Sequence, residues 1–324
     1  MDKVATASLA KARVGETVND LVQALNASAK PALDALLVYN ANPCYSLNNA
    51  KAVRDAFKKV PFVVSFSAFM DETAMASDIV LPMPTFLEGL ADVPSGSGLP
   101  ISLVGLAKPM VEPIFDTRPA GDALIQIAGS LGGTLAESFK WESHEECLKE
   151  IAADVWDTLE EEGHVVISKG TPSGTPGVNF SFLAKNPATV KAQGDYDLTL
   201  IPIDNMRLAA AVPSASPFAI KTVSDKVLAG TDVLVEVNPA TAPGIADGGY
   251  AILTTPVGSA RVRVNLSDGM MPGVIGMVKG LGHTFENNYV SHKGVNVNEL
   301  IGPVVESGSG LDAAFGINAK LSKA

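Results

Sequence analysis

Two short apolar runs near the amino terminus limit the fold more than any other feature of this sequence. The segments 34–39 and 60–66 carry apolar residues in succession (LLVY and VPFVVSF) rather than in alternation. Strands of this kind are buried on both faces, as in parallel sheets covered by helices. Helices are predicted at 16–29, 48–59, 70–77 and 120–131, with a third strand at 78–82. This alternation predicts an α/β domain with a parallel, doubly wound sheet.

The pattern changes after about residue 195, where short strands follow one another and turns rich in glycine separate them. Strands are predicted at 196–203, 231–238, 249–256, 259–266 and 272–279. Closely spaced strands of this kind are typical of a β-barrel or a sandwich. Asn238 and Pro239 predict the start of a short helix inside this region, with Asn238 as its N-cap.

Two stretches outside the strands shape the predicted domain organisation. Residues 87–102 predict a long Gly/Pro/Ser loop lying over a site or an interface, and 143–162 predict an acidic amphipathic helix. Residues 168–180 are rich in Pro and Gly and indicate a linker. We therefore expect an α/β domain over 1–167, a linker over 168–194 and a barrel over 195–324.

The bulk composition excludes several classes of function. A net charge of −11 and a pI of 4.8, without a Lys/Arg cluster, argue against a nucleic-acid partner. No apolar run reaches the ~18 residues of a membrane span, and the amino terminus lacks the apolar region of a signal peptide. The two cysteines, Cys44 and Cys147, lie far apart, so we expect no iron–sulfur cluster bound by cysteines of this chain.

The end of the first strand is the first candidate site. Asn40, Asn42 and Pro43 follow it directly, at the sheet edge where open α/β proteins bind ligands. Amide side chains there can pair with a nucleobase, since they both donate and accept. The alternative is an ordinary Asn-Pro turn, with Asn48 capping the next helix.

Further polar residues follow the second strand and lie in the barrel half. Ser65, Ser67 and the sequence Asp-Glu-Thr at 71–73 reach the same sheet edge, where Glu72 is interpreted as a helix-dipole complement. His283 follows Gly-x-Gly and is typical of a loop hydrogen-bonding residue. No histidine spacing here matches a metal site, and no catalytic triad has motif support.

The order of these motifs resembles the molybdopterin-dependent oxidoreductases of the dimethyl-sulfoxide-reductase superfamily. The resemblance rests on "ALLVYNANPCYSL", "VPFVVSFSAFMDETAMASDIVLPMPTFLE", "GLAKPMVEPIFDTRPAGDALIQIA" and the segment from "VEVNPATAPGIADGG" to "GMVKGLGH". It covers roughly residues 34–320. It implies that the barrel is a double-psi-type, molybdopterin dinucleotide-binding domain.

The resemblance also implies a cofactor, molybdopterin guanine dinucleotide, and residues that contact it. By position, Asn40, Asn42 and Pro43 correspond to the family's guanosine-contacting corner, and Thr73 and Asp78 to its second strand–helix unit. Asn238, Pro239 and His283 correspond to barrel loops near the pterin, and Asn296 corresponds to the late Gly-x-Asn. In many members a carboxylate closes the second strand, whereas Ser67 stands here. The chain also has no counterpart of the iron–sulfur module or of the segment that ligates molybdenum.

Three functional hypotheses follow from the resemblance. The first is the cofactor-binding C-terminal portion of a molybdopterin oxidoreductase in anaerobic respiratory electron transfer, in the polysulfide-reductase-like branch. The second is a molybdenum-free structural subunit of a membrane-associated menaquinone reductase, resembling the molybdopterin-like subunits of that complex and of alternative complex III. The third is a free-standing nucleotide-binding protein.

The first two hypotheses share their partners and location. The implied partners are the N-terminal half of the oxidoreductase, an iron–sulfur electron-transfer subunit and a membrane subunit that interacts with quinone. The resemblance places such a complex on the periplasmic face of the membrane; a chain outside it would be cytoplasmic.

Overall fold

The computed structural model describes residues 18–28, 33–96, 101–168, 194–208, 216–285, 288–305, 312–313 and 316–324. By compactness the chain divides into two units. The first contains the described residues of Phe66–Ala68 and Leu81–Asn179, and the second those of Gly15–Ser65, Phe69–Val80 and Phe180–Ala324. The predicted linker at 168–194 lies outside the described residues except at its two ends.

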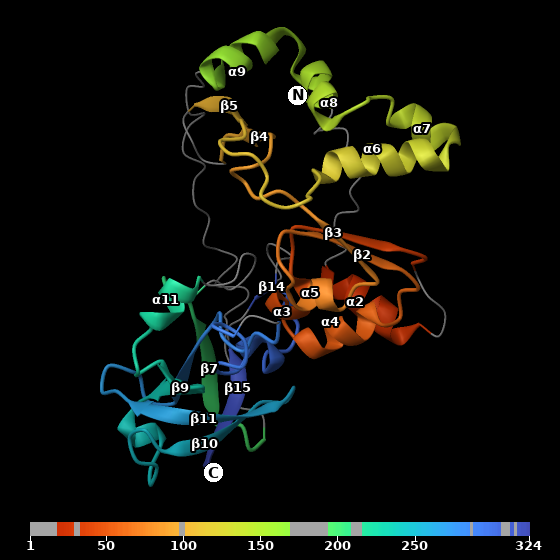
Figure 1. Ribbon diagram of the computed structural model, residues 1–324. Coiled ribbons are helices and arrows are strands. Elements are labelled where there is room, and N and C mark those ends of the chain that lie inside the picture. Colours follow the sequence, from red (N-terminus) through yellow and green to blue (C-terminus); the bar gives the residue numbers. More distant parts are fainter. Residues whose placement is uncertain are drawn as a thin grey trace. The chain divides into compact units, whose positions relative to one another are not determined.

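A three-stranded parallel sheet has the order β1 (Leu36–Tyr39), β2 (Val63–Ser67) and β3 (Ile79–Pro82), and it belongs to the second unit except for the last residues of β2 and β3. The helices α2 (Val18–Ala27) and α4 (Ala50–Phe57) lie on one face of it (Figure 1). Their apolar sides meet the sheet in a core that includes Leu25, Phe57 and Val63. β2 is buried along its whole length, as its largely apolar sequence predicted. The side chains of Leu37 and Tyr39 on β1 are exposed, so the burial predicted for this first strand is wrong.

The chain turns sharply where β1 ends. Asn40 adopts the left-handed conformation (φ 45°), which asparagine tolerates better than most residues, and α3 (Pro43–Ser46) begins two residues after Ala41. Asn49, also left-handed (φ 55°), caps α4 by accepting a hydrogen bond from the backbone of Ala52. The N-cap predicted at Asn48 is therefore wrong by one residue. α5 (Glu72–Met75) follows β2.

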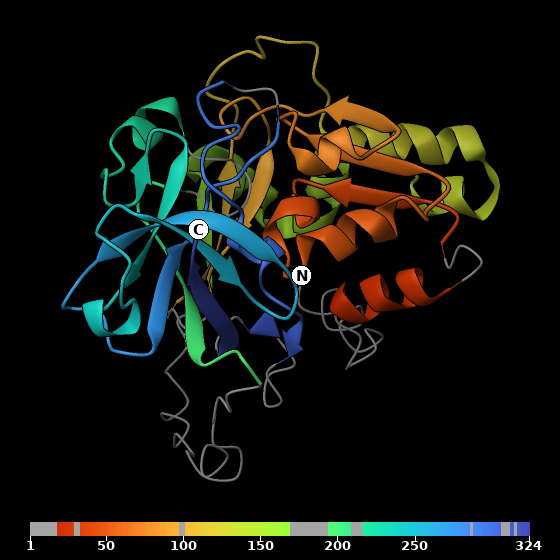
Figure 2. The same ribbon diagram turned by 90° about the horizontal axis from the view of Figure 1, so that it is seen from below.

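A closed six-stranded barrel forms the rest of the second unit (Figure 2). Its strands are β7 (Leu198–Ile203), β9 (Asp232–Val237), β10 (Tyr250–Thr254), β11 (Ser259–Leu266), β12 (Val274–Val278) and β15 (Ile317–Lys323). The order β11-β10-β15-β7-β12-β9 closes when β9 pairs with β11. The β7–β12 and β9–β11 pairs are parallel and the other four are antiparallel. Closure leaves no free sheet edge among these six strands.

The predicted fold class, a parallel α/β sheet followed by a β-barrel, is confirmed. Five barrel strands lie where the sequence predicted them, whereas β15 was not predicted. Asn238 caps the short 3-10 helix η2 (Pro239–Thr241), as expected, by accepting from the backbone of Ala240. The smaller elements are β8 (Leu228–Ala229), α11 (Pro217–Lys221), η3 (Val297–Glu299), β13 (Val304–Val305) and β14 (Asp312–Ala313).

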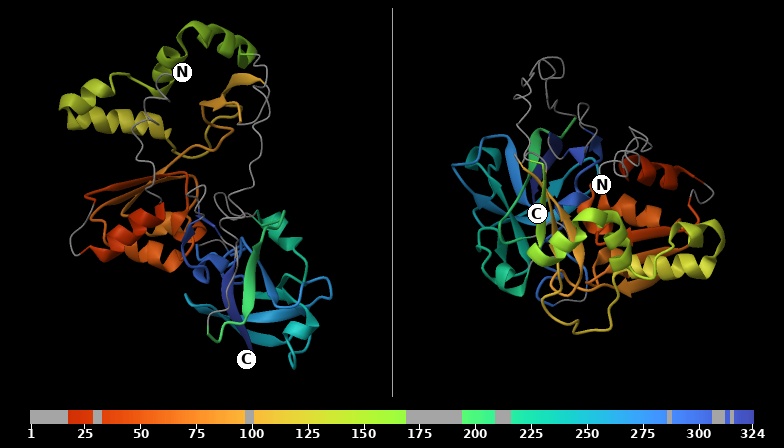
Figure 3. Two further views of the ribbon diagram at one scale, coloured as in Figure 1. Left: turned by 180° about the vertical axis from the view of Figure 1, so that it is seen from behind. Right: turned by 90° about the horizontal axis from the view of Figure 1, so that it is seen from above.

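The described residues of the first unit form a small antiparallel sheet and several helices (Figure 3). The sheet has the order β4 (Ala91–Pro94), β5 (Ser102–Ala107) and β6 (His164–Ser168). The helices are α6 (Ala120–Leu131), α7 (Gly133–Ser138), α8 (His144–Ala152) and α9 (Trp156–Glu162), with the 3-10 turn η1 (Ala153–Val155) before α9.

Two predictions for this unit are wrong. The stretch 87–102 is not a continuous loop, because β4 lies inside it and pairs with β5. β4 is exposed throughout, so it carries no apolar periodicity that would indicate a strand. The helix predicted at 143–162 is interrupted at Ala153, whose φ of 41° is incompatible with a continuous right-handed helix.

Candidate functional site

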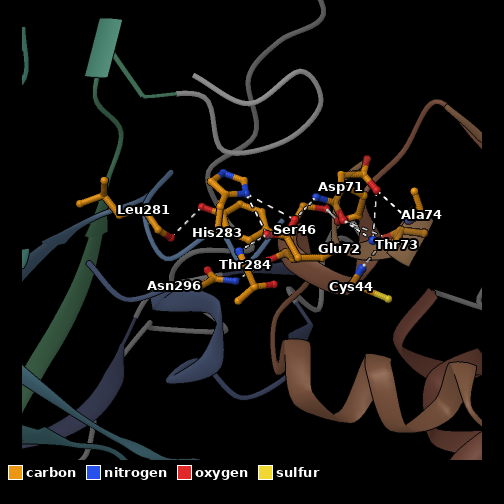
Figure 4. A network of polar contacts seen from close by, with 12 residues as sticks. Cys44, Ser46, Asp71, Glu72, Thr73, Ala74, Leu281, His283, Thr284 and Asn296 are labelled. Atoms are coloured by element: carbon orange, nitrogen blue, oxygen red, sulfur yellow. Dashed lines mark hydrogen bonds and ion pairs between the residues drawn. The ribbon is translucent and has the colours of Figure 1, made fainter. Parts of the chain in front are cut away.

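Asn42, at the end of the first strand, is buried, and its amide group is engaged by Glu72 and Thr73, both of which are labelled in Figure 4. Its Nδ2 donates to Glu72 Oε2 at 2.7 Å. Its Oδ1 accepts from the backbone N–H of Thr73 at 3.1 Å and from Thr73 Oγ1 at 2.8 Å. Thr73 Oγ1 in turn accepts from the backbone N–H of Cys44. The corner after β1 and the start of α5 are thus held together by side-chain hydrogen bonds.

Glu72 is the centre of this network, although it stands in the first turn of a short helix. Its Oε1 accepts from the backbone N–H of Thr284 at 2.7 Å and lies 3.1 Å from His283 Nδ1. Burial raises the pKa of the carboxyl, but the hydrogen bonds from His283 and Asn42 outweigh burial and lower the pKa to about 2. The buried carboxylate is therefore ionised at neutral pH and joins the α/β sheet to the barrel loop.

The imidazole of His283 is enclosed by aromatic rings. It stacks on Tyr45, with ring centroids 3.8 Å apart and planes inclined by 16°, and Phe285 meets it edge-on. An ionised carboxylate only accepts hydrogen bonds, so Nδ1 carries the proton directed at Glu72. The opposite nitrogen, Nε2, is buried and has no hydrogen-bond partner among the described residues.

Asp71, next to Glu72, likewise has one side-chain atom with hydrogen-bond partners and one without. Its Oδ1 caps α5 by accepting from the backbone N–H groups of Thr73 and Ala74. Its Oδ2 is buried without a hydrogen-bond partner among the described residues, and burial raises the pKa of this carboxyl. His283 Nε2 and Asp71 Oδ2 are thus two of four buried side-chain atoms without a hydrogen-bond partner in the described part of the chain; the others are Ser65 Oγ and Thr117 Oγ1.

Further hydrogen bonds fasten the barrel to α3. Tyr45 donates its hydroxyl to the backbone oxygen of Leu281 at 2.9 Å. Its own backbone oxygen accepts from the side-chain amides of Asn296 (2.8 Å) and Asn298 (3.0 Å). Gly282 has a positive φ of 80°, and a Cβ there would lie 2.0 Å from the backbone nitrogen of Asn296. This packing requires a residue without a side chain at 282.

The structure brings together four of the residues that the resemblance singled out, namely Asn42, Thr73, His283 and Asn296. Three others lie in or near the same corner: Asn40 is exposed, Pro43 is half-buried at the start of α3, and Ser67 is buried at the end of β2. The remaining three do not join the network. Asp78 accepts from the backbone N–H of Val63, and Asn238, which precedes Pro239, donates to the backbone oxygen of Met270.

Sequence reasoning missed Glu72, Tyr45 and Asn298. Glu72 was interpreted as a dipole complement because an acid in a helix first turn is ordinary. Its bond to His283 spans 211 positions, and no local pattern reveals such a pairing. One signal was available for Tyr45, two residues after Pro43, since the hydroxyl of a buried tyrosine usually finds a hydrogen-bond partner.

The engaged amide of Asn42 limits what this corner can recognise. Guanine presents N–H donors as well as acceptors, so reading its edge requires a free acceptor. Both acceptor positions of Asn42 Oδ1 are filled by Thr73, and Glu72 already accepts from three donors. The side chain of Ser67 carries no charge. These residues, in this arrangement, do not fit guanine recognition through Asn42. Within the described ranges, no cluster of three or more His, Cys, Asp and Glu side chains is arranged to hold a metal ion.

Comparison with known proteins identifies the family to which this chain belongs. Residues 4–129 match the molybdopterin oxidoreductase family, and residues 219–314 match the molybdopterin dinucleotide binding domain. The chain belongs to the molybdopterin oxidoreductase family.

Two individual proteins are similar to this chain over most of its length. It is 35% identical over 321 residues to the menaquinone reductase, molybdopterin-binding-like subunit, of Nitratidesulfovibrio vulgaris, covering 97% of this chain and 45% of that protein. It is 25% identical over 286 residues to the probable oxidoreductase YyaE of Bacillus subtilis, covering 78% and 42% of the two chains. The chain therefore spans less than half the length of these relatives.

A solved structure supports the fold. Acetylene hydratase from Pelobacter acetylenicus superimposes with a TM-score of 0.67 at 17% identity, over 94% of this chain and 46% of that chain. Identity at this level establishes a shared fold only. Among the described residues, every helix is too short or too polar to cross a bilayer.

Proposed function

We propose that this chain is a structural, cofactor-free portion of a membrane-associated menaquinone reductase. A relative that is 35% identical to this chain is named as a molybdopterin-binding-like subunit of menaquinone reductase, and this chain matches it over 97% of its own length. In this role the family fold would dock electron-transfer partners rather than carry out chemistry at a metal. The partners would be an iron–sulfur subunit and a membrane subunit that interacts with quinone, at the periplasmic face of the membrane.

The observation that carries this proposal is the internal use of Asn42. Its amide and the Glu72 carboxylate bond to each other and to Thr73, His283 and Thr284. A corner kept for a nucleotide would leave such groups directed at the ligand. Here they stabilise the contact between the sheet and the barrel, and Ser67 adds no carboxylate for a guanosine.

A second candidate is the cofactor-binding portion of a molybdopterin oxidoreductase. The observation that favours it is the pair of buried, unsatisfied atoms, His283 Nε2 and Asp71 Oδ2. A bound pterin would supply polar partners of the kind that such atoms lack. In that case the chain would orient the cofactor, and the cofactor would supply the redox chemistry.

A substitution at Asn40 can distinguish the two candidate functions without disturbing the fold. Its side chain is exposed and its φ of 45° is one that glycine adopts freely, so Asn40→Gly removes the amide and keeps the turn. The structural role predicts unchanged menaquinone reduction by the purified assembly. Cofactor recognition at this corner predicts lost activity together with lost pterin. Asn42→Ala is a poorer test, because it would also leave Glu72 and Thr73 without their partner.

A further inference from the structure

The first unit carries an exposed apolar surface formed by two neighbouring loops. Four of its side chains are more than three-quarters exposed: Phe86 (85%), Met110 (77%), Ile114 (81%) and Phe115 (78%). Leu87 and Val111 between them are about half exposed. We call these six residues the apolar platform. Single exposed apolar residues are ordinary on protein surfaces, whereas a contiguous group marks an interaction site.

The backbone beneath the platform is fixed by hydrogen bonds. Leu87 O accepts from the backbone N–H groups of Met110 (2.7 Å) and Val111 (3.3 Å), which joins the two loops. The Glu88 carboxylate accepts from the backbone N–H groups of Thr85 (2.8 Å) and Ile114 (3.2 Å). The backbone that carries the exposed side chains is therefore held in place before any partner arrives, which lowers the entropy cost of ordering these loops on binding.

The described residues of the first unit form only small buried groups. One cluster consists of six residues from β5, α8 and α9, namely Val104, Leu106, Leu148, Ala152, Trp156 and Leu159, and α6 buries Ala120, Ala123, Ile125 and Ala128. α7 buries none of its side chains, and Leu131 at the end of α6 is 70% exposed. Among the described residues, the platform therefore lies outside these buried groups, and further polypeptide would cover it.

The length of the relatives indicates what that polypeptide is. The chain accounts for 45% of the menaquinone reductase subunit and 46% of acetylene hydratase, so more than half of each protein lies outside the match. We propose that the apolar platform is the docking surface for a polypeptide related to that unmatched part. The inference rests on the proposed function only for the partner's identity, because the platform shares no residue with the Asn42–Glu72 network.

The charges around the platform argue against a membrane as its occupant. The second loop carries two positive and two negative side chains, Lys108, Glu112, Asp116 and Arg118, so it has no excess of positive charge. A segment that binds an anionic bilayer surface has an excess of Lys and Arg around its apolar residues. Mixed charges around an apolar centre are instead typical of the rim of a protein–protein interface.

The test is photo-crosslinking in cells of the native source, using the whole assembly. Benzoylphenylalanine replaces Phe86 or Phe115, and replaces Phe218 of α11 as the matched control, because Phe218 is also 85% exposed but lies in the second unit. Crosslinks at positions 86 and 115, but not at 218, to peptides that match the unmatched part of the relatives would support the proposal. Crosslinks to lipid or to a second copy, or equal background at all three positions, would overturn it.

A second measurement removes the aromatic side chains of Phe86 and Phe115 instead of replacing them with a crosslinker. The double variant Phe86→Ser/Phe115→Ser is expected to reduce co-purification of the partner by roughly tenfold or more, since buried aromatic anchors dominate interfaces. Phe218→Ser is expected to leave co-purification unchanged. Retention of the partner by the double variant would refute the platform. Release of pterin from the assembly would contradict the proposed function, whereas retention of the partner would contradict the platform. The two proposals can therefore fail independently.

Discussion

Replacing Glu72 with glutamine tests the central contact between the sheet and the barrel. The native network lowers the pKa of this carboxyl from 4.5 to about 2, so the ionised form is favoured by folding. A difference of this size corresponds to roughly 3 kcal/mol of free energy of unfolding at pH 7. Glu72→Gln removes the charge and places an N–H group against donors, and we expect a loss of about that size.

The pH dependence of this loss has a defined sign. Because the folded-state pKa lies below the unfolded value, the stability from Glu72 is fully present above pH 4.5 and is lost as the pH falls towards 2. The difference between wild type and Glu72→Gln should therefore shrink from roughly 3 kcal/mol at pH 7 to about 2 kcal/mol at pH 3.5.

Urea unfolding with two probes measures the effect. All five tyrosines lie in the second unit and both tryptophans, Trp141 and Trp156, in the first. Tyrosine absorbance should shift with Glu72→Gln, whereas tryptophan fluorescence should not. Glu299→Gln is the matched control, because its pair with Arg54 is about one-third exposed and contributes less than ~1 kcal/mol. A loss below ~1 kcal/mol for Glu72→Gln, or one independent of pH, would refute the reasoning.

Three further predictions concern single positions. Gly282→Ala places a Cβ 2.0 Å from the backbone nitrogen of Asn296, and thermal unfolding followed by tyrosine absorbance should show severe destabilisation of the second unit; a normal melting temperature would contradict this close packing. Ala153→Gly relieves a positive φ of 41° and should stabilise the first unit by about 1 kcal/mol in urea unfolding followed by tryptophan fluorescence; destabilisation would contradict the strain. Burial raises the pKa of the Cys44 thiol to about 11, so a thiol reagent should modify Cys147 in the native protein and Cys44 only after unfolding; early modification of Cys44 would contradict its burial.

The sequence predicts those parts of the fold that depend on local pattern. The largely apolar run before Ser67 marked a buried parallel strand, and the alternation around Val262 marked a barrel strand. β4 was missed because an exposed strand held by backbone pairing has no apolar signature. The interruption at Ala153 was missed because the apolar spacing of α8 continues into α9.

The site is predictable only in part, for a related reason. Asn42 and His283 each stand in a recognisable motif, and the structure brings them to the same carboxylate. The carboxylate itself, on Glu72, could not be identified, because its role depends on contacts with residues more than 200 positions away. Whether Asn42 binds a ligand or its own chain is decided by those contacts and not by the motif.

The most direct test of this account is the pterin content of the purified assembly. The assembly would be denatured in acid, and the oxidised pterin and the guanine released would be quantified against the amount of this chain. Because Asn42 and Glu72 are engaged with each other, we predict that neither compound is released while menaquinone reduction is intact. Release of pterin and guanine in amounts matching the chain would contradict the cofactor-free role.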